Sequence, residues 1–340
     1  MKLSGLVTRG VFFSALACLP VITVAFMMLP AIHPEAQAQQ PLRKTTIGIS
    51  SHTLGHIPLA LAKAKGYFRD EGIDLEIVIL KAGLNVPAIT AGGLDFSGII
   101  GIPINAALKG IRFKVLMVNS GLAMDLVVQP EISSISELKG KRLAIDSFGV
   151  YSHTLAEELL RHNGVNPRDV SFTAMGSTPL RLAALRAGTI QGTLLGVPHN
   201  FLAEEAGFVR LLSAQELINI PQTGIASLES KILSDPDLVY RLLKGVLKGL
   251  LHYRTNKASS IEFMTGFLGL KGSQLAERVY AYSMKVFTED GIIPSKVQRQ
   301  AIDESKRATK VTGEVNPEEI FDFHLVRRAK ADLSSAGWRP

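Results

Sequence analysis

Short apolar runs alternate with stretches of helical period along residues 45–119. The runs are rich in β-branched residues and are bounded by glycine or polar turns, which is typical of buried strands. Proline at a first turn and glycine after a last turn mark the helices between them. The pattern predicts strands at Thr45–Ile49, Leu75–Leu80, Phe96–Ile100 and Phe113–Asn119, with helices at Pro58–Lys65, at Val86–Ala91 and from Pro103.

The same alternation resumes after an extended stretch at Ala123–Gln129. It predicts a second α/β unit, with strands at Arg142–Asp146, Val170–Ala174, Ile190–Leu195 and Val209–Leu212, and helices at His153–Asn163, Pro179–Ala187 and Pro198–Ala206. Strands that alternate with helices form mainly parallel sheets, which helices cover on both faces.

A second extended stretch, Gln222–Leu228, leads the chain back, and everything beyond Pro236 is helical by period. The expected helices are Leu238–Tyr253, Ser259–Phe267, Ser273–Phe287, Val297–Ala308 and Glu318–Leu333. Two α/β units joined by two extended crossings predict a hinged body with a cleft between its lobes. We expect lobe one to comprise residues 43–123 and 219–340, and lobe two residues 124–218.

Residues 1–38 differ in kind from the rest of the chain. Two cationic residues, Lys2 and Arg9, precede an uncharged apolar run at Val11–Leu29, and a small-x-small site follows at Ala36–Ala38. This layout predicts a secretory signal peptide cut after Ala38, and therefore a periplasmic protein. The run is long enough for an uncleaved anchor, although Pro20 within it and the cleavage site favour removal.

The amino-acid composition argues against several classes of function. The formal net charge is +7 and is spread along the chain without a basic block, so it favours anionic ligands weakly and does not support nucleic-acid binding. Cys18 is the only cysteine, which excludes disulfides and thiolate chemistry from the mature chain. Aromatic residues make up 6% of the chain, which disfavours a carbohydrate site built on stacked rings.

Four histidines (His52, His56, His153 and His199) could in principle form a metal site, but none has an acidic partner nearby in sequence. Ser147, His153 and Asp146 are triad residue types without triad spacing, and no Walker lysine motif is present. We therefore predict no catalytic residue, no metal and no cofactor. A monomer that is not an enzyme is expected.

Several short motifs follow one another along the chain in the same order as in a known protein family. Leu138–Lys141 (Leu-Lys-Gly-Lys) precedes a strand, Ala60–Glu76 contains an Ala-Lys-x-x-Gly-x-Phe run, Ala91–Phe96 reads Ala-Gly-Gly-Leu-Asp-Phe, and Ala183–Gly188 reads Ala-Ala-Leu-Arg-Ala-Gly. Together with Phe321–Val326, these segments resemble the periplasmic solute-binding proteins of the nitrate, sulfonate and taurine type (NMT1/SsuA-like). One departure is Ile190–Gly192, where the family usually has Val-Asp-Ala.

The resemblance covers nearly the whole mature chain. It implies an α/β protein with the type II periplasmic binding fold, which delivers a small solute to the permease of an ABC importer. It does not identify the solute. There are two alternatives. One is a sensory receptor that feeds a signalling partner, and the other is an enzyme on the same fold, like the thiamine-pyrimidine synthases.

Open α/β sheets bind ligands at the carboxyl ends of their strands, so the loops there are the candidate solute site. The loop before His153 also opens a helix, whose amino end favours anions. We expect a small organic carboxylate or sulfonate, held mainly by neutral donors, with Arg181 as an open alternative and His52 as a hydrogen-bonding histidine. The candidate residues are Ser51, His52, Ala82, Gly83, Ile100, Gly101, Ser147, Phe148, Tyr151, Ser152, Ser177 and His199.

Overall fold

The computed structural model describes residues 41–148, 151–217 and 220–340, with the backbone alone described at Tyr151 and Leu217. Five strands form a first mixed sheet in the order β2-β1-β3-β10-β4, in which β1 is parallel to β2 and β3, and β10 is antiparallel to β3 and β4. The strands are β1 (Arg43–Ile49), β2 (Ile73–Ile79), β3 (Phe96–Ile99), β4 (Phe113–Gly121) and β10 (Pro221–Leu228).

Helices pack on both faces of this sheet. They include α1 (Ile57–Ala64), α2 (Tyr67–Asp70), α3 (Asn85–Thr90) and α4 (Gly101–Leu108), with short 3-10 turns η1 (Leu54–His56) and η2 (Ala82–Leu84). In β1, Ile47 and Ile49 enter the large core that includes α1, whereas Gly48 faces α3. A Cβ at Gly48 would lie 2.4 Å from the Asn85 side chain, so the glycine lets α3 approach the strand.

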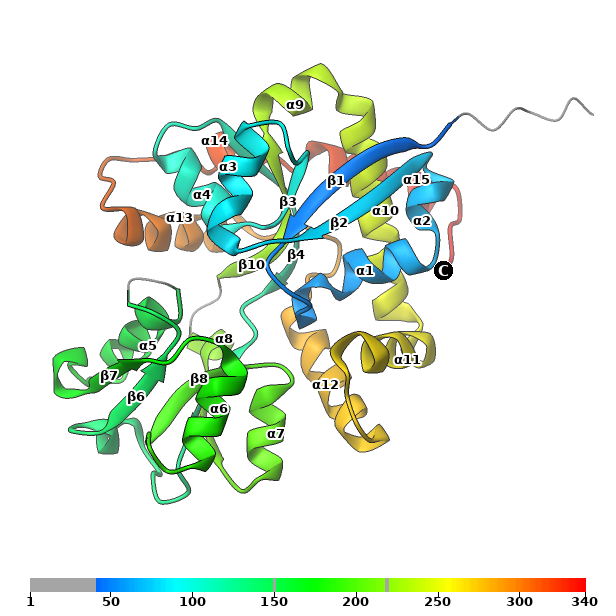
Figure 1. Cartoon of the computed structure of the whole chain (residues 1–340). Helices are drawn as coiled ribbons and strands as arrows, with labels where there is room; N and C mark the ends of the chain where they lie inside the picture. Colours follow the sequence, from blue (N-terminus) through cyan, green and yellow to red (C-terminus); the bar gives the residue numbers. More distant parts are fainter. Residues whose placement is uncertain (1–40, 149–150, 218–219) are drawn as a thin grey trace, which may run out of the picture. The chain divides into compact units, whose positions relative to one another are not determined.

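The second sheet has the order β7-β6-β8-β5-β9, with β6, β7 and β8 parallel and β5 antiparallel to both β8 and β9. Its elements are β5 (Met124–Val128), η3 (Ile135–Leu138), β6 (Arg142–Ile145), α5 (Tyr151–His162), η4 (Pro167–Asp169), β7 (Ser171–Ala174), α6 (Thr178–Arg186), β8 (Gly192–Gly196), α7 (His199–Glu205), β9 (Val209–Ser213) and α8 (Ala214–Leu217). Figure 1 shows this unit in green.

Alternation along the strands divides the second sheet between two cores. Leu143 and Ile145 of β6 pack with Leu159 of α5, whereas Ala144 between them packs with Leu182 and Leu185 of α6. The apolar runs in these strands are nearly continuous because helices bury both of their faces. The predicted α/β class is confirmed.

The C-terminal helices are α9 (Glu229–Ser234), α10 (Pro236–Thr255), α11 (Lys257–Leu268), α12 (Ser273–Val286), α13 (Ser295–Thr309), α14 (Pro317–Ile320) and α15 (His324–Ser335). The single helix expected at Glu318–Leu333 is wrong. Helix α14 ends at Ile320, Phe321 forms a parallel bridge with Val115 of β4, and α15 starts three residues later. The break buries the rings of Phe321 and Phe323 in the core.

The second extended crossing proves to be a full strand. Along β10, residues from Pro221 to Leu228 pair with β4, and Thr223 and Ala226 pair with β3. The returning chain is thus an interior strand of the first sheet, between β3 and β4, rather than a linker beside it.

Gln191, at the departure from the usual Val-Asp-Ala, keeps an acceptor at that position. Its side-chain oxygen accepts a hydrogen bond from the backbone N–H of Arg142 at 3.1 Å. The Gln191 backbone N–H also donates to the Arg142 carbonyl at 2.9 Å, so Gln191 joins the start of β6 to the residue before β8.

Candidate functional site

The strand ends of the first sheet bring three pairs of predicted residues to one edge. Since β1, β2 and β3 are parallel, the loops that leave them emerge at the same edge of the sheet. Ser51, His52, Gly83 and Gly101 are exposed there, and Ala82 is half-buried. Ile100 is different because its side chain is fully buried in the core, so only its backbone is available to a ligand.

The strand ends of the second sheet bring together the lobe-two candidates. Ser147 and Phe148 follow β6, Ser177 precedes α6, and His199 begins α7 after a cis Val197–Pro198 bond. Ser147, Phe148 and Ser177 are exposed, whereas His199 is half-buried. Residues 149 and 150 and the side chain of Tyr151 lie outside the described part, so the predicted role of Tyr151 stays a prediction.

Ser152 is buried and stabilises the loop that precedes α5. Its hydroxyl accepts a hydrogen bond at 3.0 Å from the backbone N–H of Asp146, which closes the loop between β6 and α5. The hydroxyl retains one proton to donate, so a ligand contact is compatible with this hydrogen bond.

Arg181 of α6, which the sequence pattern left only as an alternative ligand contact, is buried in the structure. It is 3% exposed, and its guanidinium donates to the carbonyl of Gly176 after β7, to the Thr178 hydroxyl at 3.2 Å and to the carbonyl of Leu194 in β8 at 3.3 Å. Its Nε has no hydrogen-bond partner. No carboxylate among the described residues lies within ion-pair distance of it.

The Arg181 charge is only weakly compensated. Burial lowers the pKa of its guanidinium, and the nearby Asp146 carboxylate opposes that shift. An arginine at this depth normally has an acidic partner, since an unpaired buried charge is costly. Arg181 therefore places a positive charge, which forms no ion pair among the described residues, beside the ends of β7 and β8.

His199 responds to the same charge. Burial lowers the pKa of its imidazole first, and the positive charges of Arg181 and Arg186 lower it further. The neutral imidazole that results has one N–H to donate and one nitrogen to accept.

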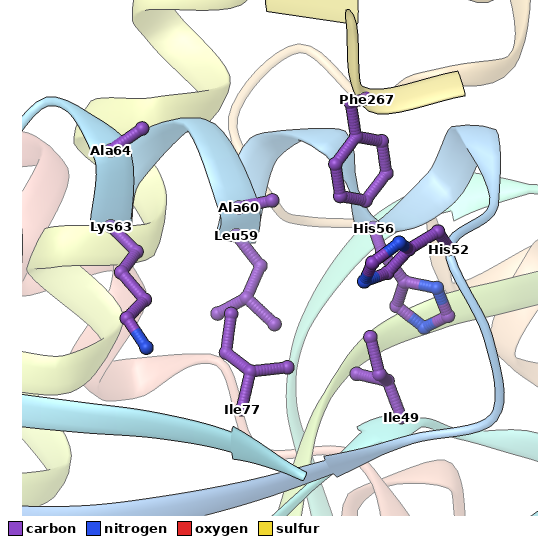
Figure 2. Close-up of a pocket in the computed structure, with 9 residues that line it drawn as sticks. All are labelled: Ile49, His52, His56, Leu59, Ala60, Lys63, Ala64, Ile77 and Phe267. Atoms are coloured by element: carbon purple, nitrogen blue, oxygen red, sulfur yellow. The ribbon is translucent and has the colours of Figure 1, made fainter. Parts of the chain in front are cut away.

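A cavity of about 460 Å³ opens beside His52 on the first sheet. Figure 2 shows its walls, with α1 on one side, Ile77 of β2 and Ile49 of β1 opposite, and Phe267 of α11 above His52. The His52 and Phe267 rings lie 4.7 Å apart with an interplanar angle of 37°. Of the twelve predicted residues, His52 is the one that lines this cavity. The nine lining residues are Ile49, His52, His56, Leu59, Ala60, Lys63, Ala64, Ile77 and Phe267.

His56 forms the inner wall of the cavity and is 2% exposed. Its Nδ1 lies 2.8 Å from the Thr53 hydroxyl, and its Nε2 makes no hydrogen bond of normal geometry. Burial lowers the pKa of His56 to about 4, against smaller opposing effects of the Gly98 and Ser51 backbones. The ring is therefore neutral at neutral pH.

In the described ranges, no three His, Cys, Asp or Glu side chains are grouped so that they could hold a metal ion. Within those ranges no helix combines the length and the apolar character that crossing a bilayer requires.

Comparison with known proteins gives a consistent result. The family model described as NMT1/THI5 like matches residues 53–257. The riboflavin-binding protein RibY of Chloroflexus aurantiacus is 25% identical over 254 residues, which is 70% of each chain. A 4-amino-5-hydroxymethyl-2-methylpyrimidine phosphate synthase of Saccharomyces cerevisiae, THI12, is 30% identical over 127 residues, which is 36% of this chain and 37% of the synthase.

Among solved structures, the putative periplasmic sulfonate-binding protein SsuA of Methylobacillus flagellatus matches with a TM-score of 0.69 and 18% identity. The match covers 88% of this chain and 97% of that one, which establishes the shared type II periplasmic binding protein fold. On the strength of the sequence match over residues 53–257, this chain belongs to the NMT1/THI5-like family.

Proposed function

We propose that this protein is an exported solute receptor of an ABC import system, which binds a small organic carboxylate or sulfonate at the strand-end loops. The observation that carries the proposal is the buried guanidinium of Arg181, whose hydrogen-bond acceptors are all neutral and which has no ion-pair partner among the described residues. A bound anion would supply the missing negative charge. Perturbed charged groups of this kind cluster at functional sites.

The neighbours of Arg181 support the same ligand chemistry. Ser177 lies four residues before it and leaves its hydroxyl without a helix-capping bond. His199 and Ser147 lie at the ends of the adjoining parallel strands. Hydroxyl and imidazole donors around one cation are suited to a carboxylate or sulfonate head.

Relatives support the receptor role. RibY is named as a riboflavin-binding protein, and SsuA as a periplasmic sulfonate-binding protein of an ABC transporter. The signal-like segment before residue 39 suits export to the periplasm.

Native mass spectrometry of freshly purified protein tests the proposal, because a receptor commonly retains its solute. We expect one small organic anion per chain, released on denaturation. Calorimetry with the identified solute should then give an affinity that falls about ten- to a hundredfold in Arg181→Gln, as expected for a lost charge-assisted hydrogen bond.

Arg186→Gln is the matched control, since Arg186 is exposed on the same helix. Arg181→Lys should retain part of the affinity because it keeps the charge without the planar fork. Melting temperatures must accompany both measurements, since Arg181 also ties Gly176 to Leu194. Unchanged affinity in a folded Arg181→Gln protein would refute the anion site.

An enzyme on the same fold is the second candidate, and the similarity to the yeast synthase over 127 residues favours it. Turnover of the retained solute distinguishes the two functions. A receptor releases the solute unchanged, whereas an enzyme yields a product of different mass.

A further inference from the structure

The cavity along α1 has features that the proposed strand-end site does not use. Only His52 belongs to both, and the remaining lining residues lie on η1, α1, β1, β2 and α11. The walls are mainly apolar, with Leu59, Ile77 and Ile49 facing the space in Figure 2. The cavity is therefore suited to an apolar group rather than to a polar head.

The spacing of its ends indicates the length of that group. His56 and Lys63 mark the two ends along α1 and are seven residues apart. At about 1.5 Å per residue the separation is about 10 Å, which an extended alkyl chain of about eight carbons spans. Alanines at positions 60 and 64 leave this length of the helix face clear.

Lys63 supplies a charge at one end. The exposed Lys63 side chain runs from α1 toward β2 beside Leu59 and Ile77 (Figure 2), and no carboxylate in the described ranges forms an ion pair with it. At the other end, the buried Nε2 of His56 makes no hydrogen bond of normal geometry. A cation beside an apolar channel is complementary to a molecule with one acidic group and an alkyl chain.

We propose that this cavity is a second binding site, which takes a medium-chain carboxylate with its alkyl chain between α1 and β2 and its carboxylate on Lys63. The cavity shares His52 with the strand-end candidates, but Arg181 and the other lobe-two candidates do not line it.

Calorimetry with octanoate on the mature protein tests this inference, with acetate and octan-1-ol as comparison probes. We expect one octanoate per chain, bound at least a hundredfold more tightly than acetate, because each buried methylene strengthens binding about fourfold. Ala60→Leu should weaken octanoate binding at least tenfold by filling the channel. Ala331→Leu, on the exposed face of α15, should not change it.

The charge is tested separately. Lys63→Gln should weaken octanoate binding about two- to fivefold and leave octan-1-ol unaffected, as for an exposed ion pair. Lys109→Gln, at another exposed lysine, should leave both unchanged. Arg181→Gln should bind octanoate like the parent, which separates this site from the anion site at the strand ends.

Two results would overturn the inference: a parent protein that does not bind octanoate, or an Ala60→Leu protein that binds it as the parent does. If Ala60→Leu fails to fold, Ala64→Leu serves in its place, because Ala64 is exposed and lines the same cavity.

Discussion

At the scale of single residues, His56 connects the cavity wall to the pH dependence of stability. Its folded-state pKa of about 4 lies below the ordinary value of 6.5, because burial disfavours the charged ring. Below pH 6.5 the His56 imidazole is protonated in the unfolded chain, whereas in the folded chain it stays neutral down to about pH 4. The free energy of unfolding should therefore decrease by about 3 kcal/mol between these two pH values from this residue alone.

His56→Gln should remove that part of the pH dependence, since glutamine does not titrate. Denaturant unfolding at pH 7 and pH 4.5 measures the difference, and His162→Gln on the exposed end of α5 is the control. A His56→Gln protein that loses stability on acidification as steeply as the parent would contradict this account.

At the scale of elements, the contact between α1 and α10 depends on one glycine. A Cβ at Gly249 would lie 2.1 Å from the Pro58 carbonyl oxygen and 2.8 Å from the Ala62 Cβ, so the two helices would have to separate. Gly249→Ala should lower the free energy of unfolding by about 1–3 kcal/mol. Gly266→Ala, in α11 with no atom within 4 Å of its new Cβ, should instead raise it by about 0.5–1 kcal/mol. Thermal unfolding of the two variants should give shifts of opposite sign.

A second contact between elements involves the buried carboxylate of Asp125 in β5. It accepts hydrogen bonds from Asn200 of α7 at 2.6 Å, from Ser213 of β9 at 2.8 Å and from the Tyr282 hydroxyl of α12 at 3.2 Å. Helix α12 is thereby attached to the second sheet, although it lies in the C-terminal helical part of the sequence.

Tyr282→Phe should lower the free energy of unfolding by about 1.5–3 kcal/mol, because a hydrogen bond to a buried charge is lost. Tyr240→Phe is the matched control. The Tyr240 hydroxyl also donates to a carboxylate, that of Asp332 at 2.5 Å, but at the surface, where water replaces it. Chemical unfolding that ranks the two variants equally would show that α12 is held by packing alone.

At the scale of the whole molecule, we expect the two lobes to close on a solute. The chain passes twice between the sheets: β4 leads into β5, and α8 lies between β9 and β10. We expect the crossing from β4 to β5 to act as a hinge. Ile79 and Leu84 on one sheet edge, and Phe148 and Leu180 on the other, are each more than half exposed. A ligand that contacts both lobes selects the closed form, in which such side chains become covered.

Small-angle scattering should therefore record a smaller radius of gyration at saturating solute. Arg181→Gln at the same solute concentration should compact less, in proportion to its lower occupancy. A radius of gyration that does not change with ligand would contradict closure.

The sequence by itself determined the α/β class, the order of nearly all strands and helices, and the family. These features are encoded locally, because burial of both sheet faces requires continuous apolar strands and because glycine and proline mark helix ends. It also predicted that strand-end loops gather at one edge, since that follows from parallel pairing. The helix expected at Glu318–Leu333 failed because its pattern cannot reveal that Phe321 pairs with Val115, more than two hundred residues away.

Only the tertiary structure decided the properties that depend on distant neighbours. Arg181 looks like any helical arginine until the carbonyls of Gly176 and Leu194 surround it and no acid approaches within ion-pair distance among the described residues. Ile100 looked available to a ligand until the core enclosed its side chain. The cavity beside His52 likewise needs α11 to bring Phe267 over α1, a contact between residues more than two hundred positions apart. The burial of a side chain and the lack of an ion-pair partner depend on residues from all parts of the fold, so a local sequence pattern cannot predict them.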